Sequence, residues 1–284
     1  MTLYYESSDG TIIDFMSNGI YAQSPETLLE NDWQYTTISG INGIAKIKRF
    51  YKDVKAYNLT LDIMTDTEEE FNALMYKMHA AFDKDVQSLI PARLWWNDFY
   101  KEIYVVASSH TEFDELFESV TKKLTILSLR PMWTREYKYQ YMISASEIGA
   151  LDYGMEGFYN GFDYDGFDYG QAENIDILNV DVISAANFEL VFYGPIQKPT
   201  VTIGKHKYGL NVDLAAGEYA TVNSLKKKIK KYDQYGHEEN IYHTRNRDSE
   251  IFEKLPAGTL QVLKSNELVF DITIYDERGE PVWI

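Results

Sequence analysis

The chain contains no cysteine among its 284 residues. This absence excludes a disulfide framework, a thiolate zinc site and a cysteine nucleophile, but it identifies no cellular compartment. Proline is also scarce, at 7 residues. A chain of this length buries enough surface to fold without cross-links. The same length suits one large domain or two of medium size, and we expect two.

Long apolar runs are missing as well. No stretch approaches the roughly 20 apolar residues that cross a bilayer. The first residues, MTLYYESSDGTIIDFMS, have neither the basic start nor the apolar run of a signal peptide. We therefore expect a soluble protein that is not classically secreted and does not contact a membrane.

Basic residues are few, with 27 Lys and Arg against 44 Asp and Glu, which gives a net charge of −17. This charge would repel a phosphate backbone, so a protein that grips nucleic acid is not expected. The same charge would suit a surface past which DNA slides without sticking. Aromatic residues are plentiful, at 15% with 23 Tyr, which favours sheet structure and association.

The first part of the chain predicts an α+β domain, residues 1–146, with one principal helix packed on a sheet. Apolar residues at helical spacing, with three Glu in the first turn, predict a helix over 67–82 whose stripe, including Leu74 and Met78, packs in the core. Alternation of apolar and polar residues predicts a strand over 57–63, and similar strands fit 102–107 and 124–130.

A change of composition marks the boundary between two domains. Residues 147–173 form a connecting segment rich in Gly and Tyr, in which GFDY occurs twice. Residues 174–284 then contain short strand candidates separated by turn signals, which predicts a β-sandwich. The whole chain is therefore predicted to be mainly β. A lysine run over 226–231 is interpreted as a solvated strand or edge, with a helix face or a nucleic-acid patch as alternatives.

Catalytic and metal signatures are incomplete. His237-Glu238-Glu239 begins like a zinc-protease motif, but Ile241 stands where the second histidine is required. Asp163-Tyr-Asp165-Gly166 resembles part of a calcium loop whose first and twelfth ligand positions do not fit. We predict no catalytic, cofactor-binding or metal residues and no enzyme. A hydrolase with paired carboxylates is the lowest-ranked alternative.

Trp95 and Trp96 are the candidate site residues. Adjacent tryptophans could stack on sugar rings, but alternate residues of a strand face opposite ways. We therefore predict one ring in the core and the other at a subunit interface.

The order of several segments resembles the distal tail protein family of long-tailed phages over nearly the whole chain. These segments are TEEEFNALMYKMHAAF, KLTILSLRPMW, FYNGFDYDGFDYG, KPTVTIG, EYATVNS, FEKLPAGTLQV and LVFDITIYDERGEPVW. The resemblance implies an N-terminal domain that assembles into a hexameric ring around the tail channel, and a galectin-like C-terminal β-sandwich. It implies no catalytic residues and no cofactor.

The resemblance predicts a structural hub of the phage tail tip that lets DNA pass. The implied partners are further copies of the chain, the tail tube protein, and a tail-tip, tail-associated or receptor-binding protein. The implied location is the tail tip of the virion, assembled in the host cytoplasm. We further expect acidic side chains of the first domain to line or flank the channel, because they would not hold DNA. The alternative is that the acidic excess only aids solubility. The main alternative is a carbohydrate-binding module that contacts the host surface.

Overall fold

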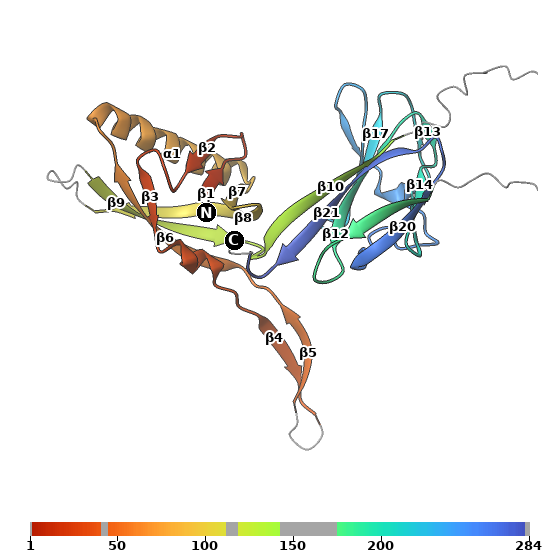
Figure 1. The fold of residues 1–284 in the computed structure, drawn as a ribbon, viewed down its shortest axis with the longest axis horizontal. Helices are drawn as coiled ribbons and strands as arrows, with labels where there is room; N and C mark the ends of the chain where they lie inside the picture. The colour runs from red at the N-terminus through yellow and green to blue at the C-terminus, as the bar shows by residue number, and fades with distance from the viewer. Residues whose placement is uncertain (1, 41–44, 112–118, 143–174, 282–284) are drawn as a thin grey trace, which may run out of the picture. The chain divides into compact units, whose positions relative to one another are not determined.

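The computed structural model describes residues 2–40, 45–111, 119–142 and 175–281 (Figure 1). The chain divides into two compact units, unit 1 with residues 1–135 and 277–284, and unit 2 with residues 136–276. The division falls inside two strands, β10 (Trp133–Tyr141) and β21 (Val269–Arg278). The predicted boundaries at 146 and 174, and the Gly/Tyr segment 147–173 with its Asp163–Gly166 motif, lie outside the described residues. The division into domains at these boundaries therefore stays a prediction.

Unit 1 is built on antiparallel strands in the order β2–β1–β7–β8–β9–β6–β3, and the start of β10 pairs with β8. The elements are β1 (Leu3–Glu6), β2 (Ile12–Asp14), β3 (Ile20–Gln23), the 3-10 helix η1 (Pro25–Leu29), β4 (Gln34–Ile38), β5 (Lys46–Tyr51), β6 (Lys55–Met64), α1 (Glu68–Ser88), β7 (Ala92–Trp96), β8 (Phe99–His110) and β9 (Ser119–Ser128). The first half of β8 pairs with β7 and its second half with β9. The long strand β8 thus joins the two parts of the sheet.

Strand β6 shows why the sheet has one buried face. Tyr57, Leu59, Leu61 and Ile63 are buried and alternate with more exposed residues, because successive side chains of a strand point to opposite faces. The strand predicted over 57–63 is thereby confirmed. The buried side chains belong to a core that includes residues of β1, β7, β8 and α1.

Helix α1 lies against this sheet (Figure 1). It begins after Thr67, whose side chain accepts a hydrogen bond from the Glu70 amide at 3.2 Å. It continues to Ser88, six residues beyond the predicted end. Met78 is fully buried, whereas Leu74 is only partly buried beside the core. The predicted apolar stripe is therefore correct, but its N-terminal half is shallower than expected.

Unit 2 contains two antiparallel sheets. One has the order β19–β18–β17–β12–β21–β10, and the other has the order β11–β20–β14–β15. The elements are β11 (Ile175–Val180), β12 (Asn187–Tyr193), β13 (Ile196–Gln197), β14 (Thr200–Ile203), β15 (His206–Gly209), β16 (Asp213–Leu214), β17 (Tyr219–Asn223), β18 (Lys228–Tyr232), β19 (Glu238–Asn240), the 3-10 helix η4 (Tyr242–Thr244) and β20 (Gly258–Lys264). The strands β13 and β16 pair separately with each other.

The two sheets of unit 2 share one core. Phe188 and Phe270 from the first sheet and Val201 and Val262 from the second are all fully buried in it. Two sheets that pack inner face to inner face form a β-sandwich. The prediction of a mainly β chain with one principal helix is confirmed for the described residues. Its galectin-like character stays a prediction. None of the helices in the described ranges is both long and apolar enough to span a membrane.

Candidate interaction surfaces

The two adjacent tryptophans of β7 occupy different environments. Trp96 is 1% exposed and lies in the core of unit 1, where its ring meets Trp133 edge-on at 6.3 Å. Trp95 is half-buried at the surface, and its indole nitrogen donates to a carboxylate oxygen of Glu6 at 2.6 Å. The Trp95 ring also stacks on Tyr4, with 5.7 Å between ring centroids. Only Trp95 is thus placed to reach a neighbouring molecule, and its role at an interface stays a prediction.

A β-hairpin formed by β4 and β5 extends from unit 1 (Figure 1). Its two strands pair only with each other among the described residues. Tyr35 and Phe50 face each other across the hairpin, with ring centroids 6.4 Å apart, and are 62% and 56% exposed. Ile38 and Ile47 are also more than half exposed. This concentration of exposed apolar side chains, which we call the apolar hairpin, is typical of an interaction surface.

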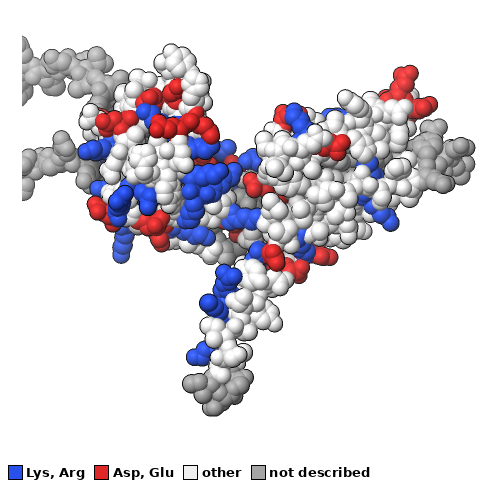
Figure 2. All heavy atoms as spheres, turned by 180° about the vertical axis from the view of Figure 1, so that it is seen from behind, with Lys and Arg blue, Asp and Glu red and all other residues white. Residues whose placement is uncertain are grey.

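The apolar hairpin is also basic. Residues 33–52 contain Lys46, Lys48, Arg49 and Lys52 and no acidic residue. Lys and Arg side chains follow the hairpin in the space-filling view (Figure 2). Without these four charges the net charge of the chain would be −21 instead of −17. The sequence reasoning missed this segment, although the lack of acids over 20 residues of a strongly acidic chain was a visible signal.

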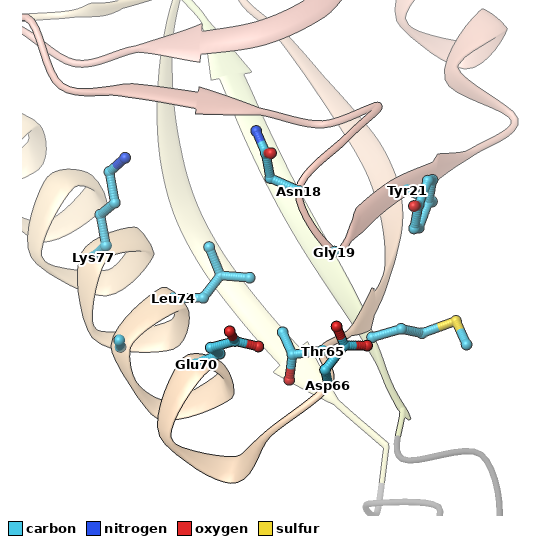
Figure 3. Close-up of a pocket in the computed structure, with 10 residues that line it drawn as sticks. Asn18, Gly19, Tyr21, Thr65, Asp66, Glu70, Leu74 and Lys77 are labelled. Atoms are coloured by element: carbon cyan, nitrogen blue, oxygen red, sulfur yellow. The ribbon is translucent and has the colours of Figure 1, made fainter.

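A groove of about 660 Å³ lies where β6 ends and α1 begins (Figure 3). Exposed apolar side chains of Tyr21 and Met64 line it together with Leu74. The carboxylates of Asp66 and Glu70 add negative charge at the same place. We call this the acidic groove.

Gly19 and Lys77 also line the acidic groove. Gly19 has a φ of +81° and approaches the main chain of Met64 so closely that a Cβ atom would collide with the Met64 carbonyl oxygen. Lys77 lines one end of the groove, and its ammonium group donates to the Ile12 carbonyl oxygen at 2.9 Å. The groove therefore combines apolar side chains with acids and with one lysine that is already held by a backbone carbonyl.

Unit 2 carries a row of tyrosines across three neighbouring strands. Tyr219 of β17 stacks on Tyr232 of β18, with 4.7 Å between centroids and 13° between planes. Tyr193 of β12 lies 6.2 Å from Tyr219 and donates its hydroxyl to Asp271 at 2.8 Å. Burial raises the pKa of Tyr193 to about 12, and the hydrogen bond to Asp271 contributes to the shift. The Tyr193 phenol is therefore a neutral donor beside a carboxylate.

The lysine run of unit 2 begins in a turn at Lys226 and Lys227 and continues into a strand, so the interpretation as a solvated strand is confirmed for the part from Lys228. Strand β18 begins at Lys228, and within it Ile229 is buried while Lys230 and Lys231 form ion pairs with Glu238 and Glu218. The pKa of Glu238 is lowered, mainly by its hydrogen bond to Lys230.

The histidine of the partial zinc-protease motif also has a local role. His237 pairs with Asp233 through Nδ1 at 2.9 Å, and the residues that follow it form strand β19 instead of a helix. The described residues include no cluster of three or more His, Asp or Glu that could hold a metal. Where a carboxyl pKa is shifted, at Asp9, Asp32, Glu218, Asp233 and Glu238, it is lowered by hydrogen bonds. The raised carboxyl pKa that a general acid requires is absent from this set.

No family model and no curated protein matches the chain. Solved structures do match it. The Dit (gp 19.1) protein of SPP1, described as a paradigm of the hub adsorption apparatus in phages that infect Gram-positive hosts, aligns with a TM-score of 0.53 and 10% identity over 97% of this chain and 98% of its own. A chain of the phage P2 baseplate, in its activated conformation with Ca, aligns with a TM-score of 0.59 and 12% identity over 96% and 98%. The same baseplate with Sr gives 0.58 and 12% over 96% and 97%. The chain therefore has the fold of phage Dit hub and baseplate proteins along nearly its whole length.

Proposed function

We propose that the chain is a non-enzymatic structural hub of a phage tail tip, where copies form a ring, six by the family resemblance. The observation that carries the proposal is the shared fold with a hub adsorption protein and a baseplate chain, over at least 96% of this chain. A match of both units in one alignment is more specific than a match of a common β-sandwich alone.

In this role the ring joins the tail tube protein to tail-tip, tail-associated or receptor-binding proteins. The exposed apolar hairpin supports a function in assembly, because monomeric proteins rarely leave so many large apolar side chains in water. DNA would pass through the ring without being held, and the acidic excess of the chain fits that requirement. The acidic lining of the channel stays a prediction that a structure of the ring would test.

Native mass spectrometry of the full chain and immunogold labelling of intact particles test this function. We expect a closed oligomer of the 32.9 kDa chain and label at the tail tip. A chain that stays monomeric at every concentration, with no label on the tail, would contradict the proposal. The virion location and assembly in the host cytoplasm are tested by the same labelling, applied to particles and to infected cells.

A second candidate is sugar binding by unit 2, which the tyrosine row favours. Aromatic rings beside hydrogen-bonding carboxylates, such as Tyr193 beside Asp271, are suited to the faces and hydroxyls of sugars. The mutual stacking of Tyr219 and Tyr232 covers part of their surfaces, which favours a structural role for these two rings. A glycan array probed with the full chain and with its Tyr193→Ala variant tests whether unit 2 binds sugar. Binding that Tyr193→Ala abolishes would support sugar recognition, and an array without hits would exclude it.

A further inference from the structure

Among the described residues, the strands of the apolar hairpin join no other strand of unit 1. Large apolar side chains on both of these strands are more than half exposed. An isolated two-stranded hairpin is at best marginally stable in water. A partner that covers Tyr35, Ile47 and Phe50 would remove this exposed surface.

The charge of the hairpin indicates which kind of surface covers it. Lys52 already interacts with the charge of Asp32. Lys46, Lys48 and Arg49 have no acidic residue within positions 33–52, so the complementary surface is acidic as well as apolar. The chain itself supplies such a surface. The acidic groove combines Asp66 and Glu70 with the side chains of Tyr21 and Met64, which are 50% and 46% exposed.

The hairpin and the groove of one copy cannot meet each other. The hairpin leads into β6 at Lys55, while the groove lies at the far end of β6, at Met64. Ten residues of extended strand separate these two points by about 30 Å. Figure 1 shows that the hairpin also points away from α1. Any contact between the two surfaces therefore joins different copies.

We propose that the apolar hairpin of one copy docks into the acidic groove of the next copy. The proposal rests on the proposed function, because a head-to-tail contact between two different patches generates a ring when the rotation closes. The hairpin would enter the groove between α1 and the ends of β3 and β6. Ile47 and Phe50, on one face of the hairpin, would cover Tyr21 and Met64. Arg49 on the opposite face and Lys48 at the bulge would face Asp66 and Glu70. The charges would set the orientation and the apolar side chains would supply most of the contact energy.

Disulfide cross-linking tests this contact directly, because the natural chain has no cysteine to interfere. The double variant Ile47→Cys/Met64→Cys places one thiol on the hairpin and one in the groove. Under oxidation we expect a ladder of disulfide-linked multimers of the 32.9 kDa chain on a gel, and a reductant should convert them back to monomers. The matched control is Ile47→Cys/Tyr235→Cys, whose second thiol replaces a side chain that is 77% exposed in unit 2. Cross-linking no stronger than in this control would overturn the proposal.

Charge reversal gives an independent measurement. Lys48→Glu/Arg49→Glu and, separately, Asp66→Lys/Glu70→Lys should each weaken self-association about tenfold or more, because like charges would then face each other. The four substitutions combined should restore association, since every copy then carries a reversed hairpin and a reversed groove. Loss without restoration would overturn the specific pairing.

The outcomes separate this contact from the proposed function. Rings that persist in all reversed variants and show no specific cross-link would overturn the docking but leave the hub intact. A natural chain that forms neither rings nor cross-links would overturn both. Salt-sensitive binding of a duplex oligonucleotide, lost in Lys48→Glu/Arg49→Glu and accompanied by no specific cross-link, would assign the basic hairpin to nucleic acid instead.

Discussion

The ammonium nitrogen of Lys101 lies 4.1 Å from the centre of the Tyr57 ring, inside the core of unit 1. The same nitrogen lies 4.4 Å from the centre of the Trp133 ring and donates to the Leu28 carbonyl oxygen at 2.9 Å. Lys101 is 1% exposed. Two aromatic faces and one carbonyl thus hold a buried lysine, and its environment is a cation–π cage.

This environment predicts a pH-dependent cost of folding. Burial, with smaller contributions from the charges of Lys55 and Lys52, lowers the pKa of Lys101 to about 7. The unfolded chain keeps this proton up to its ordinary pKa near 10.4, so the unfolded state binds more protons between these two values. The free energy of unfolding therefore rises with pH across that window, and the cost is fully present below pH 7.

Replacing Lys101 by Met removes the titrating group. We expect the stability of Lys101→Met relative to the natural chain to be greatest below pH 7 and to fall as the pH rises towards 10, at about 1.4 kcal/mol per pH unit at most. The lost bond to Leu28 adds a constant cost that does not depend on pH. Urea unfolding at pH 6, 8 and 9.5 measures the difference. Lys205→Met, at an exposed position of unit 2, is the control, and a difference for Lys101→Met that is constant with pH would refute the prediction.

Asp85 anchors helix α1 to the first strand. Its buried carboxylate accepts hydrogen bonds from the Tyr5 hydroxyl, the Ser7 hydroxyl and the Ser8 amide, the last two at 2.9 Å. Asp85→Ala would leave the buried Tyr5 and Ser7 hydroxyls without this acceptor, so we expect a loss of about 3 kcal/mol or more in unfolding free energy. Tyr5→Phe removes a donor together with its bond and should cost about 1 kcal/mol. The exposed Asp83→Ala is the control and should change stability by no more than about 0.5 kcal/mol. Equal losses of unfolding free energy for Asp85→Ala and Asp83→Ala would show that the hydrogen bonds of Asp85 do not stabilise the fold.

Substitutions of the two tryptophans of β7 should have different effects, one on folding stability and the other on self-association. Trp96→Ala removes a core side chain and should cost about 3 to 5 kcal/mol in thermal or urea unfolding. Trp95→Ala should cost less in folding but should weaken self-association about tenfold or more if Trp95 lies at the subunit interface. Sedimentation at several concentrations measures the association. Unchanged association in Trp95→Ala, compared with the surface control Tyr235→Ala, would remove Trp95 from the interface.

The division of the chain predicts which fragment folds alone. Residues 136–276 contain both sheets of the second core, including Tyr141, which stacks on Phe270 at 4.6 Å. We expect this fragment to unfold cooperatively by itself. A fragment of residues 174–284 lacks β10 and exposes one face of Phe270, so it should be less stable or unfolded. Circular dichroism melts compare the two, and a stable 174–284 fragment beside an unfolded 136–276 fragment would contradict the structural division.

Local sequence pattern was sufficient to predict β6 and most of α1. Period-two alternation identified β6, and the first-turn acids with the apolar stripe identified α1, because both signals arise from residues within a few positions of each other. The end of α1 was missed, since Asp85, three residues beyond the predicted end, is held by hydrogen bonds from Tyr5 and Ser7, which are remote in sequence. Strand geometry alone predicted that Trp95 and Trp96 face opposite sides of β7, with one ring in the core.

Only the tertiary structure decided which surfaces are available. The apolar hairpin mixes Tyr35, Ile38, Ile47 and Phe50 with polar and basic residues, a composition that would also fit a half-buried strand, and the sequence does not show that these apolar side chains remain exposed. The acidic groove unites β3, β6 and α1, and the cage of Lys101 unites β6, β8, β10 and η1. Such sites depend on contacts between residues far apart in the chain. The sequence by itself therefore determined the class of fold and the surplus of charge, whereas long-range packing decided where apolar and charged side chains meet.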